Sequence, residues 1–248
     1  MAKTSDEMEF NDFTTTRTDA MALLLTGQPT MTELGLRNDV YRRPLATALD
    51  RLEIGPGWRC VDVGAGGGDV SVALAEIVGI TGRIYAVDSD PGARDLVAAA
   101  ASAHSQVLAI TQAGEDLVLP ELVDLAFCRF LLMHVHNPGA VLTRMGSSVR
   151  PGGWVVAQEP ITSAGRIAGA AFSMPGARHP DIGASLPALV VEAGLTLVDS
   201  WAEAPAGIGH GPVIEYIKSL TGVDPGTDPV ILPPLVTILA RAPERPSR

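Results

Sequence analysis

The chain has 248 residues, of which 46% are hydrophobic and 19% are charged, and its formal net charge is −10. This length suits one α/β domain with additions, and the hydrophobic fraction is sufficient for a single buried core. The acidic balance and the lack of clustered Lys and Arg disfavour a nucleic-acid partner, and no apolar run reaches the roughly 18 residues of a membrane span.

Residues 1–52 are predicted to form an N-terminal helical segment or lid. The opening sequence, "MAKTSDEMEF", contains acidic residues and no apolar h-region, so we do not expect a secretory signal. Within "NDVYRRPLATALDRLEIGPG", apolar side chains recur near helical spacing, and a Gly-Pro-Gly stop follows them.

Strands and helices alternate through residues 53–160, which we interpret as the core. The strand-like segments are 58–64, 82–88, 106–111, 122–128 and 154–159. The helix-like segments are 68–79, 90–104 and 137–153. This order predicts an α/β fold with a doubly wound, mostly parallel sheet and helices on both faces.

Residues 161–230 are interpreted as a small substrate cap that also completes the sheet. The stretch 160–181 is rich in Gly and Pro and is predicted to be a partly helical cap or a mobile loop. A helix at 183–194 and a strand at 195–203 follow, and 205–229 reads as a long, broken connection. Residues 231–248 are assigned to the last strand and a frayed tail of the same structural domain.

The two cysteines, Cys60 and Cys128, both lie in strand-like apolar runs. Two isolated cysteines form neither a disulfide framework nor a zinc site. We therefore expect buried, reduced thiols in a cytoplasmic protein.

The stretch "VDVGAGGGDVSVALA" runs from a strand into a glycine-rich turn and then into a helix. A dinucleotide-binding G-x-G-x-x-G pattern fails here, because its third glycine would fall on Asp69. The pattern present is D-x-G-x-G-x-G, formed by Asp62, Gly64, Gly66 and Gly68. It resembles the glycine motif of the class I S-adenosylmethionine-dependent methyltransferases.

The resemblance implies contacts between the first two strands and the cofactor. The glycines and Ala65 let the backbone approach the methionine and ribose parts, and Asp62 attracts the cationic end of the cofactor. Asp88 ends the second strand, where an acid accepts hydrogen bonds from both ribose hydroxyls. Ser89 stands beside the adenine position, where the family often has an apolar residue.

Further motifs of the same family follow along the chain. "AGEDLVLP" resembles its acidic segment, which implies that Glu115 or Asp116 contacts the adenine amino group. "VDLAFCRFLLMHVHNP" resembles its fourth strand and the next turn, which places Cys128 and Arg129 beside the methionine part of the cofactor. The resemblance covers about residues 40–160 and a C-terminal stretch, and it is nearest to the small-molecule, ubiquinone/menaquinone-type branch. It implies a seven-stranded sheet whose antiparallel last strand is "VILPPLVTILARA".

Methyl transfer from a sulfonium needs orientation and exclusion of water more than a catalytic side chain, although a hydroxyl acceptor benefits from a base. Four residues are candidates for a base or a substrate contact: His134, Glu159, His179 and His210. Structural roles stay open for each of them, as packing or capping for His134, capping of the next segment for Glu159 and simple solvation for the two loop histidines. Asp181 is expected to cap the helix that begins near Gly183.

Several arginines precede or enter the predicted site. Arg129 has three possible partners, which are Asp62, the cofactor carboxylate and an acidic substrate. Arg42 and Arg43, next to Tyr41, either reach the cofactor carboxylate or remain solvated. No acidic pair flanks His134, so no metal is expected. The few aromatic residues include Phe10, Phe13, Trp154, Phe172, Trp201 and Tyr216.

We therefore expect S-adenosylmethionine-dependent methyl transfer to a small molecule, with a hydroxyl group as the expected acceptor. The alternative is a protein of this fold that binds S-adenosylmethionine and catalyses a rearrangement or decarboxylation. A nicotinamide-dependent oxidoreductase conflicts with the glycine register, and a cofactor-free scaffold is the remaining rival. A homodimer stays open, because "VILPPLVTILA" suits a core strand or an interface.

Overall fold

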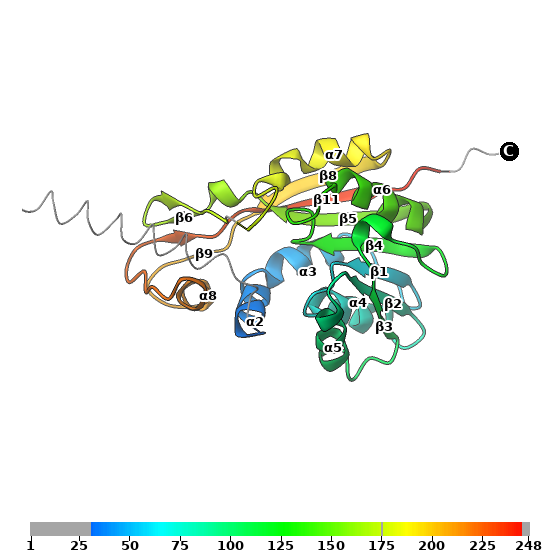
Figure 1. Ribbon diagram of the computed structural model, residues 1–248, viewed down its shortest axis with the longest axis horizontal. Coiled ribbons are helices and arrows are strands. Elements are labelled where there is room, and N and C mark those ends of the chain that lie inside the picture. Colours follow the sequence, from blue (N-terminus) through cyan, green and yellow to red (C-terminus); the bar gives the residue numbers. More distant parts are fainter. Residues whose placement is uncertain (1–30, 175, 245–248) are drawn as a thin grey trace, which may run out of the picture.

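The computed structural model describes residues 31–174 and 176–244 (Figure 1). Residues 1–30 of the expected lid, with Phe10 and Phe13, lie outside the described residues, as do Pro175 and the end of the expected tail, 245–248. No helix in the described ranges has the length and apolar character needed to cross a bilayer.

A seven-stranded sheet forms the centre of the molecule (Figure 1), as the sequence predicts. Its strands are β1 Arg59–Val63, β2 Arg83–Asp88, β3 Val107–Thr111, β4 Val123–Arg129, β5 Val149–Pro160, β8 Thr196–Glu203 and β11 Leu235–Arg241. The spatial order is β3-β2-β1-β4-β5-β11-β8. The first five strands run parallel, and β11 runs antiparallel to both β5 and β8. The expected antiparallel last strand is thus confirmed.

Helices cover both faces of this sheet, because alternate side chains of a buried strand point to opposite faces. In β4, Leu125 and Phe127 pack with the helices α3 and α4, whereas Ala126 and Cys128 pack with α6 and α7. The helices flanking the sheet are α3 Arg42–Asp50, α4 Asp69–Val78, α5 Pro91–Ala100, α6 Pro138–Ser148 and α7 Leu186–Glu192.

Capping fixes where two of these helices begin. The Asp90 side chain accepts a hydrogen bond from the Gly92 backbone N–H at the start of α5, and Pro91 occupies the first turn. Asn137 accepts one from the Ala140 backbone N–H at the start of α6. Both caps hold the helices directly after loops that leave the carboxyl ends of the sheet.

The strand order reverses between β1 and β4. From β1 the chain proceeds outward to β2 and β3, and it then returns to form β4 on the other side of β1. In open α/β sheets, ligands bind outside the carboxyl ends of the strands at such a switch point. The loops that follow β1, β2 and β4 are therefore the place to look for a site.

The prediction that 205–229 is only a broken connection is wrong. This stretch contains the short strand β9 Ala206–Gly207 and the helix α8 Pro212–Thr221. Proline in its first turn and the left-handed Gly222 after its end delimit α8. Its buried face carries Val213, Ile214, Tyr216 and Ile217.

Three other predicted segments also differ in detail. The stretch 160–181 contains the 3-10 turn η2 Thr162–Ala164 and the strands β6 Arg166–Ile167 and β7 Ala170–Ala171, so the helical interpretation holds for one turn alone. The predicted last strand divides into β10 Val230–Ile231 and β11, because the prolines between them have no N–H to donate to a ladder. The helix predicted near the N-terminus divides at Tyr41 into α2 Met31–Val40 and α3.

A second, four-stranded sheet of order β7-β6-β10-β9 lies beyond one end of the main sheet (Figure 1). At that end β11 begins, where Leu235 pairs with Pro160 and Glu203, the last residues of β5 and β8. The small sheet shares an apolar core with α8 and α2, including Tyr41, Phe172 and Ile214. We call α2, α8 and the small sheet the cover.

Candidate active site

The glycine turn after β1 brings bare backbone to the switch point. Gly64, Gly66 and Gly68 have φ angles of +76°, +48° and +82°, a region that favours glycine. A Cβ atom on Gly64 would lie 2.8 Å from Leu131 Cδ1, so a larger residue does not fit there. The buried Ala65 donates its N–H to the Val87 carbonyl and ties the turn to β2.

Asp88, at the end of β2, faces the same turn. Its Oδ2 accepts a hydrogen bond of 2.9 Å from the Gly66 backbone N–H, and its Oδ1 accepts one of 2.9 Å from Asp90 N–H. A carboxylate has about four acceptor positions, so two remain for a ligand. Ser89 follows and is exposed.

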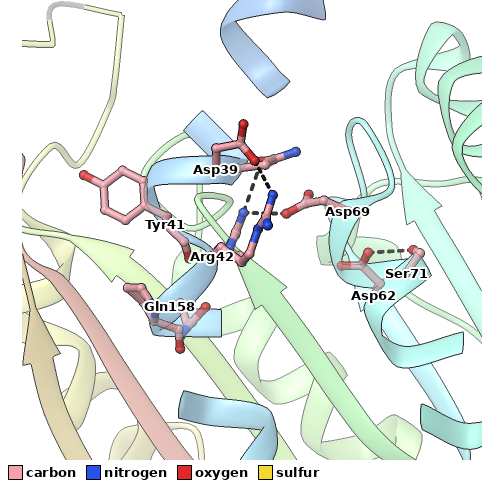
Figure 2. A network of polar contacts seen from close by, with 10 residues as sticks. Asp39, Tyr41, Arg42, Asp62, Asp69, Ser71 and Gln158 are labelled. Carbon is pink, nitrogen blue, oxygen red and sulfur yellow. Dashed lines mark hydrogen bonds and ion pairs between the residues drawn. The ribbon is translucent and has the colours of Figure 1, made fainter. Parts of the chain in front are cut away.

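Asp62, near the end of β1, is almost completely buried beside the turn. Its Oδ2 accepts a hydrogen bond of 2.6 Å from the Ser71 hydroxyl (Figure 2). The pKa of Asp62 is raised to about 7, mainly by burial and also by the nearby Asp69 carboxylate, against the opposing effects of the Ser71 bond and the Arg129 charge. Among the described residues, no cation forms an ion pair with Asp62.

Arg129 ends β4, as predicted, but its partner is not Asp62. Its guanidinium forms an ion pair of 2.5 Å with Asp69 and a hydrogen bond of 3.1 Å with Asn38 Oδ1 of α2. A longer bond reaches the Tyr41 carbonyl. Burial lowers the pKa of Arg129, and the Asp69 charge counteracts this effect. Arg129 therefore connects the helices α2 and α3 to the turn.

The other expected cofactor residues lie around this centre. Glu115 and Asp116 belong to the turn η1 Gly114–Asp116, where the half-buried Glu115 carboxylate accepts a hydrogen bond from the His136 backbone N–H and Asp116 is exposed. Cys128 lies at the carboxyl end of β4, but its thiol is in the core, where burial raises its pKa well above the usual range. Like Cys128, Cys60 is a buried free thiol.

Glu159 contacts the loop after β4 instead of the segment after β5. Its carboxylate accepts backbone hydrogen bonds from Leu131, Leu132 and Met133, at 2.9, 2.7 and 3.3 Å. Burial raises the pKa of Glu159 to about 7, and these three bonds oppose the increase. The expectation that it caps the next segment is thus wrong, and the structure gives it a part in shaping residues 131–133.

Two of the three candidate histidines lie next to this loop. The His134 side chain has a large exposed fraction, but part of it is buried. This partial burial and the Arg37 charge lower the pKa of His134 from 6.5. The His179 backbone N–H donates to the Met133 carbonyl, and its Nε2 is buried without a hydrogen-bond partner among the described residues. His210 is exposed before α8, and no hydrogen bond in the described ranges joins it to the 131–134 loop.

Two smaller expectations also have outcomes. Arg42 is exposed and pairs with Asp39, and the exposed Arg43 lies 3.8 Å from Glu203, so these arginines are surface residues. Asp181 does not cap the following helix by its side chain, because its Oδ1 accepts the Ser163 backbone N–H. Within the described ranges, no group of three His, Cys, Asp or Glu residues is arranged to hold a metal ion.

Sequence reasoning missed a group of residues on the cover side of the site. The Arg37 guanidinium lies 5.0 Å from the centre of the Phe130 ring, and Tyr41 meets the same ring edge-on at 5.1 Å. Phe130 directly follows β4 and has a φ of +53°. The spacing of Arg37 and Tyr41 by four residues was the available signal, because the Tyr41 N–H still donates to the Arg37 carbonyl as in a helix.

Comparison with known proteins gives matches over this same region. A family model described as "Methyltransferase domain" matches residues 36–200. The Ubiquinone biosynthesis O-methyltransferase of Burkholderia thailandensis is 30% identical over 100 residues, which cover 40% of this chain. The matched part is 43% of that relative's length, so the chain spans less than half of it.

Solved structures share the fold at low sequence identity. A putative methyltransferase from Bacillus halodurans is similar with a TM-score of 0.62 and 17% identity, over 80% of this chain and 98% of that chain. The N-methyltransferase NodS from Bradyrhizobium japonicum, solved in complex with S-adenosyl-L-homocysteine, has a TM-score of 0.55 and 17% identity, over 84% of this chain and 91% of that chain. At identities this low, the structural similarity shows a common fold alone.

Proposed function

Because the chain belongs to the class I S-adenosylmethionine-dependent methyltransferase family, we propose that it binds this cofactor at the glycine turn and methylates a hydroxyl group of a small molecule. The observation that carries the proposal is the open glycine turn at the switch point, with Asp62 and Asp88 at the ends of the two adjoining strands.

The charges beside the turn suit the cofactor's methionine end. Arg129 pairs with Asp69, and no cation among the described residues forms an ion pair with Asp62. When Asp62 is ionised, its carboxylate would attract an ammonium or sulfonium group. The free acceptor positions of Asp88 suit the two ribose hydroxyls.

The remaining contacts follow from position. Ala65, Gly66 and Gly68 would bind through the backbone, and Ser89 with Glu115 or Asp116 would border the adenine. Cys128 would contribute main chain alone, because its thiol belongs to the core. These assignments are part of the proposal.

A hydroxyl acceptor is supported by His134. Its lowered pKa leaves the imidazole neutral at pH 7, so it can accept the hydroxyl proton as the oxygen becomes a nucleophile. When bound, S-adenosylmethionine supplies an electrophilic methyl group. Glu159 would act as a positioning residue that holds the 131–133 loop, and His179 lies behind that loop. The cover would exclude water.

Binding is tested by calorimetry with S-adenosylhomocysteine on the wild type, Asp88→Ala and the control Asp95→Ala, an exposed acid on α5. We expect micromolar binding by the wild type and the control, and at least about tenfold weaker binding by Asp88→Ala, since charge-assisted hydrogen bonds are lost. Absence of wild-type binding, or equal binding by all three proteins, would refute the proposed site.

Transfer is tested by S-adenosylhomocysteine release over paired small phenols and amines. His134→Ala should lower kcat on the phenol by about 10²-fold or more, with unchanged S-adenosylhomocysteine affinity. Transfer confined to amines would overturn the hydroxyl assignment and leave the transferase activity intact. Cofactor binding without any methylated product across the panel would favour the non-methylating alternative.

A further inference from the structure

Arg37 is a cation on the cover side of the site. It lies on α2 and is half-buried, and its Nε is buried with no hydrogen-bond partner in the described ranges. No ion pair of Arg37 is found among the described residues either. A buried N–H without a hydrogen bond is unfavourable.

Neighbouring arginines show how the chain treats such groups elsewhere. The buried Arg129 has Asp69, the exposed Arg42 has Asp39, and Arg51 has Asp199 at 2.5 Å. Arg37 instead adds positive charge, because it lowers the pKa of both Arg129 and His134. Arg37 is thus close enough to His134 for its charge to act on the imidazole.

The neighbours of Arg37 belong to both the strand ends and the cover. Phe130 follows β4 directly, Tyr41 packs on its ring, and the Arg37 charge acts on Tyr216 of α8 as well. On the same helix, Leu34 Cδ1 is 3.8 Å from a Cβ built on Gly67, so α2 touches the glycine turn.

We propose that Arg37 binds a carboxylate group of the methyl acceptor, so that the enzyme acts on small carboxylic acids. This inference rests on the proposed function. A guanidinium binds a carboxylate with two parallel hydrogen bonds, which would satisfy the buried Nε, and the aromatic rings of Phe130, Tyr41 and Tyr216 would enclose the apolar part of the ligand. The carboxylate would then set the acceptor's orientation relative to His134.

The cofactor has a carboxylate too, so the experiment separates the two sources. S-adenosylhomocysteine is titrated into the wild type, Arg37→Met, Arg37→Lys and the control Arg94→Met, which changes an exposed arginine on α5. We expect the same affinity within about twofold for all four. A loss of about tenfold or more in Arg37→Met would assign Arg37 to the cofactor carboxylate and overturn the proposal.

Acceptor binding is measured by titrating benzoate, and its neutral isostere benzamide, into the same proteins with and without S-adenosylhomocysteine. Benzoate should bind the wild type and Arg94→Met at least about tenfold more tightly than benzamide. Arg37→Met should lose this preference, and Arg37→Lys should retain part of it. Thermal melting confirms that each variant is folded.

Each result has one meaning. Equal binding of benzoate to the wild type and Arg37→Met contradicts the Arg37 assignment. No benzoate binding to the wild type up to about 10 mM contradicts it as well. Failure of S-adenosylhomocysteine to bind the wild type contradicts the proposed function instead. In that case Arg37-dependent benzoate binding to the protein alone still supports a carboxylate site.

Discussion

Replacing Asp62 by Asn should make the ligand-free protein more stable at neutral pH, and it should weaken cofactor binding. The pKa of Asp62 is raised from 3.8 to about 7, so the folded state holds this proton more tightly than the unfolded state does. Wild-type stability therefore falls as the pH rises from about 4 to about 7, and it stays level above that range.

The size of the effect follows from the same pKa values. Between pH 5 and pH 8 the wild type should lose about 2–3 kcal/mol through Asp62, at about 1.36 kcal/mol for each unit of pKa difference. Asp62→Asn has no proton to lose, and its amide oxygen can still accept the Ser71 hydroxyl. Its stability relative to the wild type should rise by this amount over the same interval.

The assay is urea unfolding at pH 5, 6, 7 and 8, followed by tryptophan fluorescence. Asp124→Asn is the matched control, because Asp124 is also buried but pairs with Arg150 and accepts the Arg59 backbone N–H, so its replacement should destabilise at pH 8. Asp62→Asn should bind S-adenosylhomocysteine at least about tenfold more weakly. Parallel pH profiles for the wild type and Asp62→Asn would refute the reasoning.

Two further outcomes test the geometry of the site. Arg129→Met should destabilise the protein by about 3–5 kcal/mol, because Asp69 loses its buried partner. Hydrogen exchange should also increase in α2, because the bond from Arg129 to Asn38 is lost. An unchanged exchange pattern would show that Arg129 does not hold this helix. Gly64→Ala should lower the stability by about 1–2 kcal/mol, because residue 64 has a positive φ. It should also abolish S-adenosylhomocysteine binding, because the added Cβ would displace Leu131. Full binding in calorimetry would contradict the close approach of the cofactor to the Gly64 backbone.

The core was predictable because its signals are local. Each strand from β1 to β4 is a short apolar run, and the helices α4, α5 and α6 begin at Gly, Asp or Asn. The strand predicted at 154–159 begins earlier, because β5 includes residues 149–153 that were predicted to be helical. The helix α8 was missed because the Gly and Pro residues around it indicated a loop. Four buried apolar residues of α8 recur at helical spacing, but the Gly and Pro residues on either side were given more weight in the prediction.

The partners of charged residues were less predictable. Asp62 was the acidic side chain predicted as a possible partner of Arg129, and Asp69 was not predicted. The Asp69 pair depends on the pairing of β4 with β1, which brings the end of β4 close to the start of α4. Glu159 reaches backward to residues 131–133 because β5 lies beside β4 in the sheet. Such contacts depend on three-dimensional register, which sequence spacing does not specify.

The cover is built from segments that are separate in the chain but leave the main sheet at one end (Figure 1). The excursion after β5 supplies β6 and β7, and the excursion between β8 and β11 supplies β9, α8 and β10. The first excursion ends before β8 and the second ends before β11, and neither interrupts the pairing of these strands. Acceptor preference could therefore change during evolution through these two loops, while the cofactor turn and the folding core are inherited unaltered.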